Sequence, residues 1–305
     1  MFSGISLLCF TACYVVSLFL EGTRLLFQAG ARFALIFGFA AAGLFAHSIY
    51  LIVRAQHEMA DGLPLSSWYD WCLVVSWTLA AGYLLFTVYR PRVALGLFVL
   101  PLVLGLNVVA WAWRELPPFS QSEATRGWGT IHGVALLLGT VVVALGFVAG
   151  SMYLVQASRL KRKLPPRHGL ELPSLEWLQA ANVHCLVVSS CLLVLGVVSG
   201  VILNLVKSVN EISTTPWSGS VVWGSGILLS WQFAAILFNR FYKPARQGKK
   251  VAYLTVASFI FVALAVGMAL LTRHGSPSGA EVENGSRAFH GYLHAPISTK
   301  NGRHV

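Results

Sequence analysis

Residues 183–206 read VHCLVVSSCLLVLGVVSGVILNLV and contain no Asp, Glu, Lys or Arg. Because the hydrocarbon core of a bilayer takes about 20 apolar residues of helix, a run of this length predicts a membrane-spanning helix. Seven further apolar runs lie at about 5–20, 33–53, 68–89, 93–113, 128–155, 221–241 and 251–271. The sequence therefore predicts an all-α protein, a polytopic helical bundle of about eight membrane-spanning helices.

The composition of the chain excludes an ordinary soluble globule. Hydrophobic residues make up 56% of the chain, charged residues make up 11%, and the mean hydropathy is +0.69. The first run resembles a signal peptide in length, but no basic stretch precedes it and no small-residue cleavage site follows, so we interpret it as a helix. We expect residues 1–275 to form one membrane domain and the polar residues 276–305 to form a flexible tail.

The basic residues predict the orientation of the chain in the membrane, since short cytoplasmic loops are rich in Lys and Arg. The connections after the first, third, fifth and seventh runs hold 14 of these residues, and the other three hold four. This bias predicts a multi-pass protein of the inner, cytoplasmic membrane with both termini on the extracytoplasmic side. The net charge of +11 follows from these loops, so nucleic acid is not a predicted partner.

Four histidines at or within the predicted spans are the candidate functional residues, because a polar side chain in a membrane is costly unless it has a role. His132 opens the fifth run and His274 closes the eighth, both at the outer surface, whereas His47 lies deeper and His184 lies near the cytoplasmic surface. Neutral imidazole is a good ligand for haem iron. His132 and His274 could therefore bind one haem iron, and His47 could hold a second porphyrin, with His184 a weaker candidate. The alternative is that these side chains only form hydrogen bonds between helices.

Tryptophans are frequent on the predicted outer face, and Trp128, Trp217 and Trp223 lie near the ends of the fifth and seventh runs. They are typical of the aromatic belt at a membrane interface, and they would also provide a flat apolar surface for a porphyrin. The chain has no C-x-x-C-H motif, and its five cysteines lie in apolar runs. Any haem is therefore expected to be haem b, bound non-covalently.

Several ordered motifs resemble one family of membrane proteins. They are GLPLSSWYD at 62–70 followed by VVSW at 74–77, IHG at 131–133, PSLE at 173–176, LGVVSG at 195–200 and GKKVA at 248–252. Together they resemble the CcsA/ResC-type cytochrome c assembly proteins, whose relatives include the HemX and YpjD proteins. The resemblance covers most of residues 30–275.

The resemblance implies a bundle that receives haem and presents it on the outer face to apocytochrome c, together with a second membrane protein that has a large outer domain. It implies that His132 and His274 are the outer histidine pair and that His47 is the intramembrane ligand. Two features depart from the family pattern: PWSGSVVWG at 216–224 replaces a W-G-x-x-W-x-W-D segment, and Asn239 replaces a histidine. The chain is therefore interpreted as a divergent relative.

Three functions follow from this interpretation. The first is haem handling during cytochrome c maturation, as a possible haem-lyase component without independent turnover. The second is a HemX-like regulator of haem biosynthesis that acts through a protein partner. The third, a secondary transporter, is favoured least, because inverted repeats and broken helices with midplane charges are not evident.

Overall fold

The computed structural model describes residues 6–24, 32–61, 67–115, 123–163, 171–209, 220–241 and 248–274. These segments are helical, apart from short connections and one isolated bridge between Val93 and Glu171. Their helices are α1 (Leu7–Thr23), α2 (Arg32–Asp61), α3 (Trp68–Tyr89), α4 (Gly96–Ala112), α5 (Glu123–Lys161), α6 (Leu175–Val209), α7 (Ser220–Phe241) and α8 (Gly248–His274). Each helix overlaps one of the predicted apolar runs, which confirms the all-helical class.

Four of the described helices contain stretches with the length and composition of membrane spans. Four stretches are long and apolar enough to cross a bilayer: Arg32–His57, Trp68–Tyr89, Gly127–Lys161 and Leu175–Val209. Shorter apolar helices occur at Leu7–Thr23, Gly96–Ala112 and Val222–Phe238. The chain therefore forms a membrane-type helical bundle. The predicted tail, residues 276–305, lies outside the described residues.

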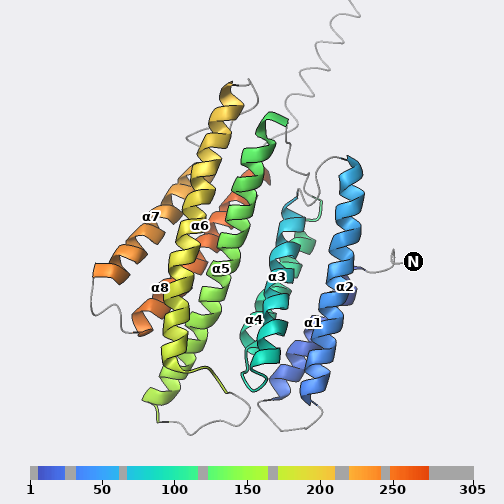
Figure 1. Ribbon diagram of the computed structural model, residues 1–305, viewed down its shortest axis with the longest axis vertical. Coiled ribbons are helices and arrows are strands. Elements are labelled where there is room, and N and C mark those ends of the chain that lie inside the picture. Colours follow the sequence, from blue (N-terminus) through green and yellow to red (C-terminus); the bar gives the residue numbers. More distant parts are fainter. Residues whose placement is uncertain are drawn as a thin grey trace, which may run out of the picture.

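The helices run up and down in two halves, with α1–α4 on one side and α5–α8 on the other (Figure 1). Successive helices are antiparallel, so α1, α3, α5 and α7 end at the end of the bundle where α2, α4, α6 and α8 begin (Figure 1). The most extensive helix contact is between α5 and α6, and α5 also joins the two halves through α3 and α4.

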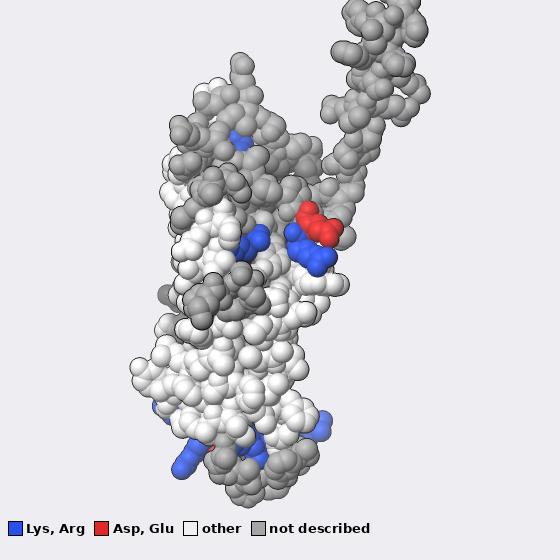
Figure 2. All heavy atoms as spheres, turned by 90° about the vertical axis from the view of Figure 1, so that its right-hand side faces the viewer, with Lys and Arg blue, Asp and Glu red and all other residues white. Residues whose placement is uncertain are grey.

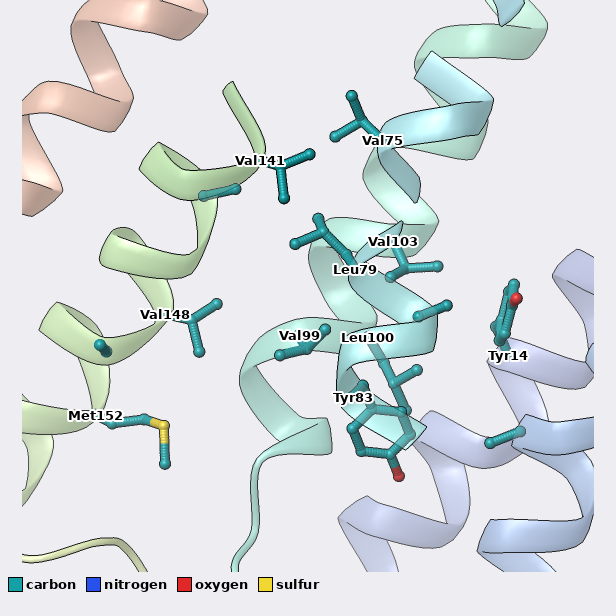
Figure 3. Close-up of a cluster of buried hydrophobic side chains, with 14 of the residues drawn as sticks. Tyr14, Val75, Leu79, Tyr83, Val99, Leu100, Val103, Val141, Val148 and Met152 are labelled. Atoms are coloured by element: carbon teal, nitrogen blue, oxygen red, sulfur yellow. The ribbon is translucent and has the colours of Figure 1, made fainter. Parts of the chain in front are cut away.

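The joint between the halves is lined by buried apolar side chains (Figure 3). Val141, Val148 and Met152 of α5 belong to one buried cluster with Leu79 of α3 and Val99 of α4. In a bilayer the surrounding lipid is as apolar as these side chains, so they stabilise the fold through close contact rather than through removal from water.

Two glycines let α5 approach its neighbours. A Cβ atom built on Gly146 would lie 3.1 Å from Cβ of Cys185 on α6. A Cβ atom on Gly150 would lie 2.7 Å from Oγ1 of Thr255 and 3.0 Å from the backbone oxygen of Ala252, both on α8. Small residues at helix contacts are the usual way in which membrane helices pack closely. The second half is therefore built around α5.

A buried ion pair joins α2 to α3. The guanidinium of Arg54 binds both carboxylate oxygens of Asp70, which is fully buried and also accepts hydrogen bonds from the backbone and side chain of Ser67. Arg54 also lies over the ring of Tyr69, 4.6 Å from its centroid, and Tyr69 shares a 2.5 Å hydroxyl contact with Tyr50. Asp70 lies within a predicted span, but it was not among the candidates from the sequence.

A second polar cluster fixes the end of α1 to α3 and to the connection between α3 and α4. Glu21 is 2% exposed, accepts a 3.2 Å hydrogen bond from the hydroxyl of Tyr83, and pairs with Arg24 at 3.5 Å. Arg24 also donates hydrogen bonds to the backbone oxygens of Pro91, Arg92 and Val93.

On the face shown in Figure 2, a white band without charged groups separates the Lys and Arg side chains at the base from those higher up. Such a band suits the hydrocarbon layer of a membrane.

Candidate functional site

His132 lies on α5, nine residues after its first residue, and faces α6. Its Nδ1 atom is 2.6 Å from the backbone oxygen of Gly196, and the side chain is half-buried. A carbonyl oxygen can only accept a hydrogen bond, so Nδ1 must carry the proton. In the neutral ring the lone pair is then on Nε2, which is the nitrogen that a metal ion would bind.

Gly200 provides the space that the ring of His132 fills. A Cβ atom built on Gly200 would lie 2.8 Å from both Nδ1 and Cε1 of His132. Gly196 and Gly200 stand four residues apart, and therefore on the same face of α6. The ring thus lies against a glycine-lined face of α6, and its orientation is set by packing as well as by the hydrogen bond.

The residue after His132 packs against α3. A Cβ atom on Gly133 would lie 2.8 Å from Cζ2 of Trp71, one of the tryptophans near the start of α3. His132 and Gly133 therefore sit where α3, α5 and α6 meet. This junction combines an oriented imidazole with a nearby aromatic ring.

The register between α5 and α8 gives the level of His274. Phe147 of α5 stacks on Phe259 of α8 with ring centroids 4.4 Å apart, and Val143 lies in the same cluster as Val262. The two helices are therefore antiparallel, so residues nearer the start of α5 lie beside residues nearer the end of α8. His132 is 11 residues before Val143, and His274 is 12 residues after Val262. At about 1.5 Å per residue both positions lie at the same level of the bundle. The side chain of His274 lies outside the described part.

The three candidate tryptophans have different surroundings. Trp128 lies one turn before His132 on α5 and is 38% exposed. Trp223, near the start of α7, is 66% exposed. Trp217 falls outside the described residues. The two described rings are open to lipid or to a bound ligand.

His47 occupies a different environment, in the first half of the bundle. Its ring is fully buried and stacks on Phe10 of α1 at 4.1 Å between centroids, with an angle of 5° between the planes. Its Nδ1 is 3.4 Å from the hydroxyl of Tyr14, and its Nε2 has no hydrogen-bond partner among the described residues. Because His47 is fully buried, a porphyrin could reach its Nε2 only if the side chains packed around it moved, so this site stays a prediction.

His184 lies far from the other histidines of the second half. It is exposed, and its Nδ1 is 2.8 Å from the backbone oxygen of Ala180 on the same helix. It precedes Gly196, the neighbour of His132, by 12 residues, which corresponds to about 18 Å along α6. His184 and His132 therefore cannot bind one iron atom together. The described residues contain no group of three or more His, Cys, Asp or Glu side chains that could hold a metal ion.

The acceptor on α6 was not identified from the sequence. The two glycines of the LGVVSG stretch at 195–200 are four residues apart, and this spacing is the sequence signal for a helix face that can accept a ring. Asn239, the position where the related family has a histidine, has no described side chain.

Comparisons of the chain with protein-family models, with curated proteins and with solved structures gave no match. The likeness to cytochrome c assembly proteins therefore rests on the motifs quoted above.

Proposed function

We propose that this chain is an inner-membrane protein with eight spans and extracytoplasmic termini, and that it binds haem b non-covalently and presents it during cytochrome c maturation. The alternation of helix directions and the bias in basic residues support this topology. The proposed partners are haem, apocytochrome c and a second membrane protein with a large outer domain. The chain itself would carry out no turnover.

The observation that carries this proposal is the hydrogen bond from Nδ1 of His132 to Gly196. It leaves Nε2 as the nitrogen with the lone pair, which suits haem iron. When bound, haem supplies an iron centre and a vinyl-bearing ring for attachment to a cytochrome. His274, at the same level on α8, is proposed as the second histidine that would hold the iron.

The tryptophans and the deeper histidine have secondary roles in this proposal. Trp128, one turn from His132, would cover one edge of the porphyrin, and Trp217 and Trp223 would do so from the α7 side. His47 is proposed to hold haem on its route through the first half. His184 has the weakest claim, because it lies about 18 Å along α6 from the level of His132.

An absorption spectrum tests the proposal directly. The protein purified from a haem-replete host should show a Soret band, which His132→Ala and His274→Ala should weaken. His57→Ala is the control, since it removes an exposed histidine of α2 that is not a candidate ligand, and it should leave the band unchanged. Cytochrome c levels in cells should fall with the first two variants only. A wild-type protein without a Soret band, or a His132→Ala variant with normal cytochrome c, contradicts the proposal.

A HemX-like regulator of haem biosynthesis is the second candidate, and one feature favours it. The 216–224 stretch has no aspartate and only two tryptophans, whereas the family segment that faces apocytochrome c is dense in tryptophan. Deletion of the protein separates the two candidates. A regulator would change porphyrin pools and leave cytochrome c attachment intact.

A further inference from the structure

The backbone oxygen of Gly196 accepts hydrogen bonds from two side chains. Nδ1 of His132 is 2.6 Å away, and Oγ of Ser199 is 2.8 Å away. Ser199 is 1% exposed, so its hydroxyl has little access to water. Two side-chain donors therefore share one carbonyl at the contact between α5 and α6, and within α6 this carbonyl is also the ordinary i→i+4 acceptor of the Gly200 backbone N–H.

A carbonyl oxygen has two lone pairs, so when two side chains and a backbone N–H compete for it, each hydrogen bond is weaker than it would be alone. The hydroxyl of Ser199 has a single proton, and it is directed at this oxygen. Removing that hydroxyl should strengthen the bond from His132. Adding a methyl group at Gly200 should break it, because the new carbon would overlap the ring at 2.8 Å.

We propose that Gly196, Ser199 and Gly200 form a positioning element for His132. Gly200 admits the ring, the oxygen of Gly196 fixes the proton on Nδ1, and Ser199 limits how strongly that oxygen draws on the Nδ1 proton. The position of the proton on the His132 ring does not depend on bound haem, whereas the effect on iron rests on the proposed haem function.

Changes at Ser199 and at Gly200 should shift the reduction potential of bound haem in opposite directions. A stronger bond at Nδ1 makes Nε2 a better electron donor, which favours the ferric state and lowers the reduction potential. Ser199→Ala should therefore lower the potential of bound haem. Gly200→Ala should raise the potential and weaken haem binding by about tenfold or more, as the loss of groups that orient a metal ligand commonly does.

The first experiment needs no haem. Protein labelled with ¹⁵N-histidine, in micelles, should give the His132 signals of a ring protonated at Nδ1 and unprotonated at Nε2. In Ser199→Ala the Nδ1 proton should move downfield, as a stronger hydrogen bond requires, and in Gly200→Ala the preference for this tautomer should be lost. A wild-type ring protonated at Nε2 overturns the positioning element.

Two control variants match these changes. Ser230→Ala removes an exposed serine on α7 that also bonds the backbone of its own helix, at 2.8 Å from the oxygen of Gly226. Gly105→Ala adds a methyl group where nothing among the described residues lies within 4 Å. Neither should alter the His132 signals. If Gly200→Ala does not fold, the wild-type tautomer and Ser199→Ala still decide.

The second experiment is a potentiometric titration of the haem-loaded protein. Shifts of opposite sign for Ser199→Ala and Gly200→Ala support the proposal. Shifts in the same direction overturn it, because they would mean that both variants only disturb the contact between α5 and α6. If no haem binds but the expected tautomer is present, the haem function fails and the positioning element stands.

Discussion

Replacing Arg54 by methionine should destabilise the protein by about 3.5–4 kcal/mol, chiefly because it removes the charged partner of a buried carboxylate. Asp70 is fully buried, and its two oxygens receive hydrogen bonds only from Arg54 and Ser67 among the contacts described. Methionine keeps the apolar length of the side chain and removes the guanidinium. The substitution therefore isolates the charge.

The magnitude follows from the exposure of the two partners. Breaking a buried ion pair on one side costs about 3–5 kcal/mol. The side chain of Arg54 is 31% exposed, so water will partly solvate the carboxylate that remains, which places the loss near the lower limit. Loss of the contact with the ring of Tyr69 adds about 0.5–1 kcal/mol. Asp70→Asn combined with Arg54→Met should recover about 1–2 kcal/mol, because no unpaired charge is left.

Equilibrium unfolding in mixed detergent micelles, followed by tryptophan fluorescence, measures this difference. Arg114→Met is the matched control: its pair with Glu115 is exposed on both sides, and its loss should cost less than about 0.5 kcal/mol. Equal losses for Arg54→Met and Arg114→Met, or no recovery in the double variant, would refute the view that this ion pair holds α2 against α3.

Three further outcomes are expected. Gly150→Ala should cost about 1–3 kcal/mol in the same unfolding assay, since the added carbon would lie 2.7 Å from a hydroxyl of α8, whereas Gly105→Ala, with open space, should not; equal effects would contradict the close packing. Tyr50→Phe removes a 2.5 Å hydroxyl contact and should cost about 1 kcal/mol, and an unchanged stability would show that the contact adds nothing. Single cysteines at Glu115 and Lys163, in a chain whose five native cysteines are replaced, should react with an impermeant reagent from opposite sides of the membrane; labelling from one side would disprove the proposed topology.

The positions of the helices could be read from the sequence because each apolar run is long and is interrupted by polar or basic residues. The start of α3 is also marked in the sequence, where Ser67 and Asp70 form a capping box. These features depend on residues that are close in the chain. They predict where each helix lies in the chain, but not which other helices it packs against.

The pairing of helices could not be predicted, since a helix that is apolar on every side gives no signal of which face meets protein and which meets lipid. Arg54 and Asp70 lie 16 residues apart in the chain, and His132 and Gly196 lie 64 apart. The stacking of Phe10 on His47 could not be predicted for the same reason, because the two residues lie far apart in the chain. The candidate histidines could be named from the sequence, whereas the orientation of His132 required the contact between α5 and α6.

The polar cluster at the end of α1 constrains how the protein is made. The acceptors of Arg24 lie 67 to 69 residues later in the chain, and the tyrosine that binds Glu21 lies 62 residues later. At about 5–20 residues per second, a ribosome needs about 3–14 seconds to add that length. During this interval Tyr83 and the backbone acceptors of Arg24 do not yet exist, so the first helix is made before the groups that fix it to the rest of the fold.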